Sequence, residues 1–269
     1  NTTGEKNTAV GTFSLDSNTT GSHNTALGYE ALTSNTQGDS NVSVGWKSLE
    51  LNTTGDSNVA VGRDALGENT TASNNTALGH NTLNANTTGH SNTAVGKGAL
   101  KDNTTSFNTA VGFQAAESTT SGIGQVVVGC NALQNNTTGG SNTAIGLDCL
   151  QQNTTASNNT GVGRDALKLN TTGTNNTSIG ANALDANTTG QSNVAVGNGA
   201  LGSNTTASNN TAVGKNALIL NTIGTENTAI GTSCLTANTE GNANIAIGFQ
   251  CLDANTTGGA NTAVGRSAL

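Results

Sequence analysis

The stretch Asn7–His23 reads N-T-A-V-G-T-F-S-L-D-S-N-T-T-G-S-H, and the chain repeats this pattern to its end. The motif returns every 17 residues, with a single step of 16 between Asn92 and Asn108. We number the repeat positions from 1, the first Asn, to 17, so that the consensus is N-T-A-V-G-x-x-A-L-x-x-N-T-T-G-x-x. A fixed period of this kind indicates a repeat architecture.

Two positions of the repeat carry its sizeable apolar residues. Position 4 is Val, Leu or Ile in every copy, and position 9 is Leu in every copy except at Ala116. Positions 3 and 4 alternate small and large, which is the period of a strand. One repeat cannot bury a core with two such residues, but stacked repeats can. We therefore expect the core to include Val10, Leu15, Leu27, Leu32, Val44, Leu49, Val61, Leu66, Val196, Leu201, Ile247 and Leu252.

The repeat predicts an all-β fold, a parallel β-solenoid (β-roll) of 17-residue coils with about 16 rungs spaced ~4.8 Å apart. Helical repeats are longer, and Asn-Thr-Thr-Gly is a poor helix former. We expect residues 1–269 to form a single continuous array, part of a longer fibre because it starts and stops within a repeat. The irregular stretch 103–125, with the 16-residue step and Thr119 in place of Asn, predicts a local distortion or, alternatively, a domain boundary.

Three further columns predict how each coil turns. Position 5 is always Gly, which indicates a corner with positive φ or close backbone contact. Positions 1 and 12 are almost always Asn, which tolerates turn conformations and can stack its amides into ladders. Ligand binding by these Asn columns is the alternative.

The composition excludes several classes of protein. Charged residues make up 9% of the chain, there is no Pro, and the net charge is −7. A disordered chain is usually rich in charge or Pro. The sequence has no basic patch of the kind that binds nucleic acid, and it has no run of ~18 apolar residues that could span a membrane.

The motifs N-V-A-V-G at Asn193–Gly197 and N-I-A-I-G at Asn244–Gly248 resemble the head repeat of YadA-like trimeric autotransporter adhesins. The whole chain is similar to the N-T-A-V-G-x-x-A-L-x-x-N-T-T-G arrays of phage and viral tail-fibre proteins. The resemblance implies left-handed β-rolls, a parallel homotrimer and a displayed binding surface, on an extracellular, cell-surface or virion fibre. The adhesin repeat is shorter than 17 residues, and the matching motif is structural, so it carries over no binding residue.

The chain offers no recognisable catalytic cluster, which would need a nucleophile, a base and an orienting group together. His23, His80 and His90 occupy different repeat positions, with no recurrent carboxylate or Cys beside them. We expect no catalysis, no cofactor and no metal, although His80 and His90 fall within one turn and leave a metal site as the alternative.

The cysteines allow two interpretations. Cys149, Cys234 and Cys251 all occupy position 8, where Ala is usual, and Cys packs well as a small buried residue. Alternatively, Cys234 and Cys251 stack one rung apart, at about 4.8 Å, within the Cα separation of a disulfide. Cys130 with Cys149 is a weaker candidate pair.

Position 6 carries side chains too mixed to share one core, so we expect it to face water or another chain. Exposed aromatic and Arg side chains suit contact with host glycans or surface proteins. The alternative is a surface without a binding role. The candidate binding column comprises Tyr29, Trp46, Arg63, Phe113, Arg164 and Phe249.

These features favour a non-catalytic structural or adhesive segment of a surface fibre. A solenoid that polymerises end to end into a filament is the first alternative. Ice binding by stacked Thr columns is the second, although adjacent residues such as Thr19 and Thr20 point to opposite sides of a strand. Apolar residues at position 2, such as Val42 and Val59, favour burial against partner chains and hence a homotrimer.

Overall fold

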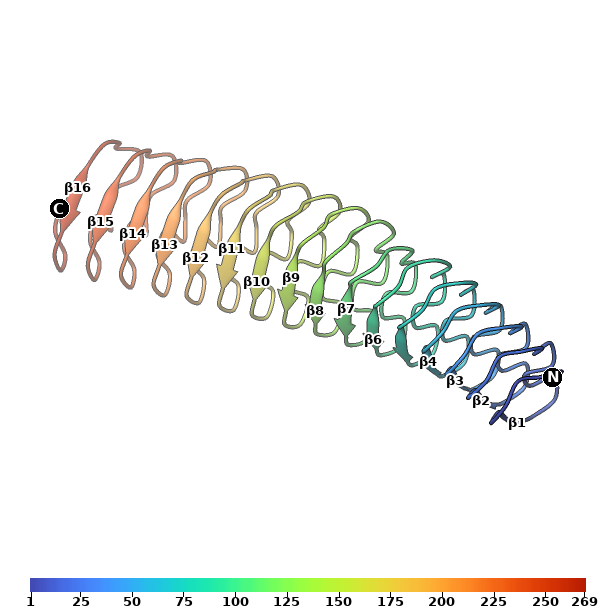
Figure 1. The fold of residues 1–269 in the computed structure, drawn as a ribbon. Helices are drawn as coiled ribbons and strands as arrows, with labels where there is room; N and C mark the ends of the chain where they lie inside the picture. Colours follow the sequence, from blue (N-terminus) through green and yellow to red (C-terminus); the bar gives the residue numbers. More distant parts are fainter. The chain divides into compact units, whose positions relative to one another are not determined.

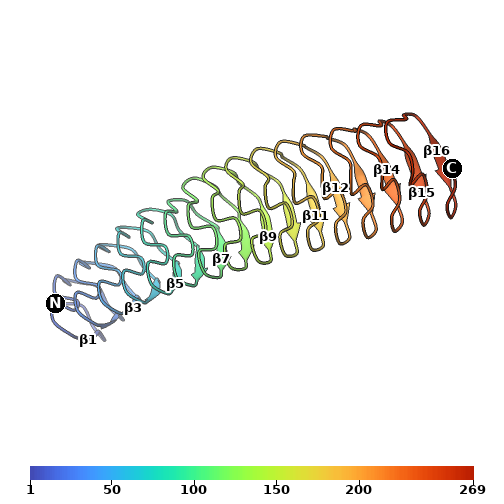
Figure 2. The same ribbon diagram turned by 180° about the vertical axis from the view of Figure 1, so that it is seen from behind.

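The structure, a computed structural model, describes residues 1–269 and confirms the predicted fold class. Each repeat forms one coil of a parallel β-solenoid, with one three-residue strand at positions 2–4 and turns elsewhere (Figures 1 and 2). No helical segment has the length and hydropathy needed to cross a membrane. The handedness of the coil stays a prediction.

The chain comprises two compact units, of eight strands each. The first unit comprises Asn1–Asn131 and Asn136–Thr138, and the second Ala132–Asn135 and Gly139–Leu269. The strands of the first unit are, in sheet order, β1 (Thr8–Val10), β2 (Thr25–Leu27), β3 (Val42–Val44), β4 (Val59–Val61), β5 (Thr76–Leu78), β6 (Thr93–Val95), β7 (Thr109–Val111) and β8 (Val126–Val128). Those of the second are β9 (Thr143–Ile145), β10 (Thr160–Val162), β11 (Thr177–Ile179), β12 (Val194–Val196), β13 (Thr211–Val213), β14 (Thr228–Ile230), β15 (Ile245–Ile247) and β16 (Thr262–Val264).

Within each unit, neighbouring strands pair in parallel with equivalent repeat positions side by side. Thr25 of β2 lies opposite Val42 of β3, and Val194 of β12 lies opposite Thr211 of β13. Backbone hydrogen bonds also join the turns of successive rungs, as from the Leu201 N–H to the Ala217 carbonyl at 3.0 Å. Every part of the coil is therefore held in the same register as the strands.

The apolar interior consists of Leu at position 9 and small residues at positions 3 and 8. Leu201, Ala195 and Ala200 are all 0% exposed. Half of the predicted core is therefore confirmed. The buried members of that prediction are Leu15, Leu32, Leu49, Leu66, Leu201 and Leu252.

The other half of the predicted core was wrong, because position 4 lies on the outside of the coil. Alternation along a three-residue strand turns only its middle residue inward. The interior behind the strand has room only for a small side chain, mostly Ala, so the larger position 4 faces outward. The misassigned residues are exposed or half-buried: Val10, Leu27, Val44, Val61, Val196 and Ile247.

The interior of the coil, where position 4 was expected, holds asparagine side chains instead. In the position 1 ladder, Asn210 Oδ1 accepts the backbone N–H of Asn227 at 3.0 Å, and its Nδ2 donates to the Gly224 carbonyl at 2.9 Å. In the position 12 ladder, Asn204 Nδ2 donates to Asn187 Oδ1 and to the Ala207 carbonyl, each at 3.0 Å. These asparagines are 0% exposed. The Asn columns are therefore hydrogen-bonded ladders inside the coil, which confirms the structural interpretation of them.

Tight corners shape the rest of the coil. Gly214, at position 5, has φ 136°, and a Cβ there would lie 2.5 Å from the carbonyl oxygen of Gly231 in the next rung. Both predicted reasons for an invariant Gly are therefore confirmed. Position 9 is also left-handed, with φ 52° at Leu201, although it carries a full side chain.

The 16-residue repeat 92–107 lacks the Gly of position 15, and Thr105 replaces its contacts. Asn103 Nδ2 donates to the Thr105 carbonyl at 2.7 Å, and the Thr105 hydroxyl donates to the Gly122 carbonyl at 2.7 Å. Asn103 keeps the carbonyl bond of the equivalent asparagines but makes no ladder bond to the previous rung, and Asn86 Oδ1 is left buried without a hydrogen-bond partner. Strands β6, β7 and β8 nevertheless stay paired in register, so the distortion is local.

The left-handed backbone at position 9 predicts an unusual response to branching. Ile has the same composition as Leu, but its branched Cβ tolerates positive φ poorly. We expect Leu201→Ile to lower the free energy of unfolding by about 1–3 kcal/mol. The unbranched control Leu201→Met should cost less than about 1.5 kcal/mol. Urea unfolding followed by circular dichroism measures both, and equal losses would contradict this explanation.

Candidate functional site

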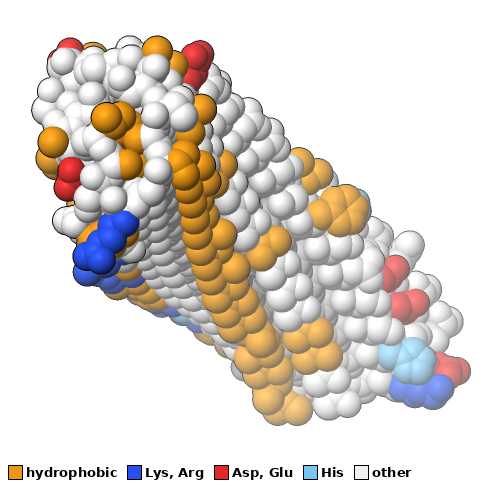
Figure 3. Space-filling model, turned by 90° about the vertical axis from the view of Figure 1, so that its left-hand side faces the viewer, with side chains coloured by type: hydrophobic (Ala, Val, Ile, Leu, Met, Phe, Trp, Pro, Cys, Tyr) orange, Lys and Arg blue, Asp and Glu red, His pale blue; other side chains and the backbone are white.

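The residues at position 4 form an exposed column, which we call the apolar column. Leu27 is 47% exposed in the first unit and Ile179 is 42% exposed in the second. Figure 3 shows hydrophobic side chains that follow one another in rows on the surface. The exposed members also include Val61, Leu78, Val111, Val128, Ile145, Ile230, Ile247 and Val264. Contiguous apolar surface of this kind is typical of an interaction site.

A second surface feature, the aromatic strip, comprises Phe13, Tyr29, Trp46 and Arg63 on four successive rungs of the first unit. The ring centroids of Phe13 and Tyr29 are 6.2 Å apart, and those of Tyr29 and Trp46 are 6.5 Å apart with an interplanar angle of 12°. The Arg63 guanidinium lies over the Trp46 ring, 4.7 Å from its centroid. The register of the coil therefore brings these side chains into one row that remains partly exposed.

A charged network borders the aromatic strip. Lys47 Nζ lies 3.1 Å from a Glu30 carboxylate oxygen and 2.7 Å from one of Glu50. Hydrogen bonding from Lys47 holds the pKa of Glu30 below its usual value, and the carboxylates raise the pKa of Lys47. A hydrogen bond to Glu30 is the main cause of the raised pKa of Tyr29. Exposed pairs of this kind add little stability but orient the side chains that they join.

The structure brings together only part of the predicted binding column. Tyr29, Trp46 and Arg63 lie in the aromatic strip. Elsewhere in the first unit, Phe113 has Lys97 Nζ 5.8 Å from its ring centroid. In the second unit, the predicted Phe249 lies beside Arg266, at 5.5 Å, and the predicted Arg164 pairs with Asp165 at 3.2 Å. A binding role for this column stays a prediction.

The cysteines are all free thiols, so the alternative of a disulfide between Cys234 and Cys251 is not formed. Equivalent side chains of stacked rungs point the same way, and each of these two thiols donates to an Ala carbonyl 12 residues ahead. Burial raises the pKa of Cys149 to about 12 and, with the nearby Cys251, that of Cys234 to about 11. Cys130 is exposed. Position 8 therefore uses Cys as a small buried residue.

The histidines form no shared site in this structure. His90 packs edge-on against Phe107, with ring centroids 4.8 Å apart. No group of three or more His, Cys, Asp and Glu side chains is arranged to hold a metal ion.

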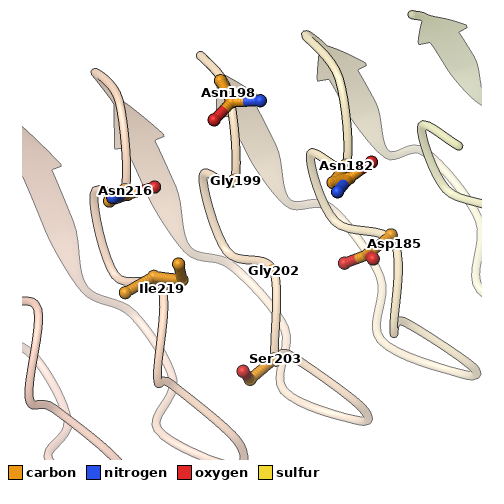
Figure 4. Close-up of a pocket in the computed structure, with 8 residues that line it drawn as sticks. All are labelled: Asn182, Asp185, Asn198, Gly199, Gly202, Ser203, Asn216 and Ile219. Carbon is orange, nitrogen blue, oxygen red and sulfur yellow. The ribbon is translucent and has the colours of Figure 1, made fainter. Parts of the chain in front are cut away.

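A third surface feature, which we call the notch, lies in the second unit. It was not predicted from the sequence. It is a depression of about 320 Å³ over the rung that carries Gly199 and Gly202 (Figure 4). This is the only repeat with Gly at both position 7 and position 10, and that coincidence is the signal that could have located it. The lining side chains are Asn182, Asp185, Asn198, Ser203, Asn216 and Ile219.

The thiols provide a chemical test of the cysteine assignment. A buried thiol with a raised pKa stays protonated at pH 8 and reacts slowly, because the thiolate is the nucleophile. We expect one fast-reacting thiol, Cys130, when the native protein meets Ellman's reagent at pH 8, and four after unfolding without reductant. The variant Cys130→Ser should abolish the fast phase. Two thiols after unfolding would instead indicate a disulfide.

Comparison with known proteins assigns this chain to no family. No protein-family model matches the chain, and a search of curated proteins finds no match.

Proposed function

We propose that this chain is a non-catalytic structural segment of an extracellular or virion surface fibre, which self-associates as a homotrimer and presents a binding surface. The regular solenoid supports this role because identical rungs give a uniform surface that can be extended by adding repeats. The resemblance to fibre and adhesin repeats supports the same role.

The apolar column is the observation that carries the proposal. Positions 2 and 4 both face outward from the strand, but position 2 is Thr in most copies and Val or Ile in the others, whereas position 4 is never polar. Strand propensity alone would accept Thr at both positions. The strict choice of Val, Leu or Ile at position 4 therefore fits a surface that is covered by another chain.

Copies of the same chain are the partner that fits best. A column with one apolar residue per rung matches a column with the same spacing, so parallel chains can pack rung against rung. The flanking position 2 adds further apolar surface, as at Val126 (44% exposed) and Ile245 (42% exposed). A closed trimer around the apolar columns would cover them on every chain.

The aromatic strip supports the adhesive part of the proposal. Tyr29 is 43% exposed and Trp46 is 41% exposed, although aromatic side chains make up only 2% of the chain. Partly exposed aromatic and Arg side chains are the types enriched at binding surfaces.

The alternatives differ from the trimer in their assembly and in the surface they use. A filament would grow by contact between chain ends and would not need the apolar column. Ice binding would use Thr columns, but Thr hydroxyls at position 13 donate along the ladder, as from Thr188 to the Thr205 carbonyl at 3.1 Å.

The oligomeric state tests the proposal. We expect light scattering on a sizing column to give three times the 26.5 kDa chain mass for the wild type. The double variant Ile179→Lys/Ile230→Lys places charges in the apolar column and should give single chains, because unpaired charges are costly to bury. Thr206→Lys, at an exposed turn position, should leave the trimer intact.

A wild-type chain with the mass of a monomer would overturn the trimer. A mass that rises without limit with concentration, and is the same in both variants, would favour the end-to-end filament. The control is the circular dichroism spectrum of each variant, which should be the same as that of the wild type if the fold is retained.

A further inference from the structure

The notch exists because one rung lacks two side chains that the neighbouring rungs carry. At position 7 the three rungs carry Asn182, Gly199 and Asn216, and at position 10 they carry Asp185, Gly202 and Ile219. The two walls are therefore two rungs apart, about 9–10 Å between backbones. Figure 4 shows the glycines at the floor, with one pair of side chains on each side.

The walls carry complementary hydrogen-bonding groups. The Arg164 guanidinium donates to Asn182 Oδ1 at 3.2 Å, which leaves the Asn182 amide nitrogen on the side facing Gly199. On the opposite wall, Asn216 Oδ1 faces the notch and would lie 2.8 Å from a Cβ added at Gly199. A donor on one wall and an acceptor on the other suit adjacent hydroxyl groups, each of which both donates and accepts.

Asp185 adds a partly buried carboxylate that forms no salt bridge. Burial raises its pKa, and the backbone amides of Asp185 and Ala186 lower it in part. The nearby Lys168 is already shared between Asp148, at 3.2 Å, and Asp165, at 2.9 Å. A half-buried carboxylate without a cation is stabilised by hydroxyl donors.

The same charges narrow the class of ligand. The notch lining carries one carboxylate, Asp185, and no cation, so an anionic ligand would be repelled. A single lining carboxylate is too few for a hard divalent cation, which prefers several oxygen ligands with charge. Ile219, whose Cδ1 would lie 3.5 Å from a Cβ at Gly199, offers one apolar contact. A neutral, hydroxyl-rich ring with an apolar C–H face matches all of these groups.

We propose that the notch binds one neutral pyranose ring of a glycan, with Asp185, Asn182 and Asn216 bonded to its hydroxyls and Ile219 against its C–H face. Its volume of about 320 Å³ lies at the small end of ligand sites. This inference names a ligand class for the adhesive role and rests on that part of the proposed function.

The repeat itself supplies the variant that tests the notch. Gly199 has φ 67°, and Asn occupies the same position with φ 55° at residue 182 and 57° at residue 216. Gly199→Asn should therefore fold normally while its side chain fills the notch. Gly98→Asn is the matched control, because Gly98 has φ 70° at the same repeat position but its rung carries Lys101 at position 10.

The probes are the methyl pyranosides of glucose, galactose, mannose and N-acetylglucosamine at millimolar concentration. Saturation-transfer NMR should detect at least one of them on the wild type and on Gly98→Asn. Gly199→Asn should lose that signal at least tenfold, and Asp185→Asn should weaken it. No signal with any probe on the wild type, or an equal signal on Gly199→Asn, would overturn the proposal.

An array of immobilised glycans separates this inference from the proposed function. Binding that survives Gly199→Asn but is lost in Tyr29→Ala/Trp46→Ala would leave the adhesive role standing and remove the notch as its site. Pyranoside binding by a chain that is a monomer and binds no immobilised glycan would support the notch and contradict the fibre role.

Discussion

Two buried ladders of asparagine amides hold the rungs of this protein in register. Apolar contacts alone would tolerate a shifted stack, because Leu and Ala pack against any apolar neighbour. An amide buried at 0% exposure, in contrast, needs a partner at a fixed place, and here that partner is the amide or backbone of the equivalent residue one rung away. Shifting one rung would leave several buried polar groups unpaired, at about 1–3 kcal/mol each.

The ladders also explain why the side chains with a proposed role lie on the surface. With one Leu, two small residues and two asparagines per rung filling the coil, no further sizeable side chain fits inside. Val and Ile at position 4, the aromatic residues at position 6 and most of the charges must then lie outside. Because the register is fixed, any outward column within a unit becomes a row with one side chain per rung. The apolar column, the aromatic strip and the notch are three uses of this geometry, and the notch arises where side chains are left out.

The period of 17 made the fold class predictable, since the same spacing governs strand pairing, the Gly corners and the Asn ladders. The period could not say which way a three-residue strand faces, because both Ala and Val at positions 3 and 4 are apolar. Hydrophobicity favoured Val10 and Leu27 as core residues. The interior of the coil is too narrow for them, so the Ala of position 3 faces inward instead. The notch was readable in principle from Gly199 and Gly202 together, but only the structure shows that positions 7 and 10 lie side by side. The thiol state of Cys234 depended on side-chain direction, which spacing does not give.

The most direct test of the ladder is to remove one of its amides. Asn193→Ala deprives the buried Asn210 N–H of its partner, at 3.0 Å, and leaves the Ala207 carbonyl with only the donor from Asn204. The account predicts a loss of about 1–3 kcal/mol in the free energy of unfolding, measured by urea titration, and no significant change for the exposed control Thr206→Ala. A loss below about 0.5 kcal/mol for Asn193→Ala, the size expected of an ordinary surface substitution, would contradict it.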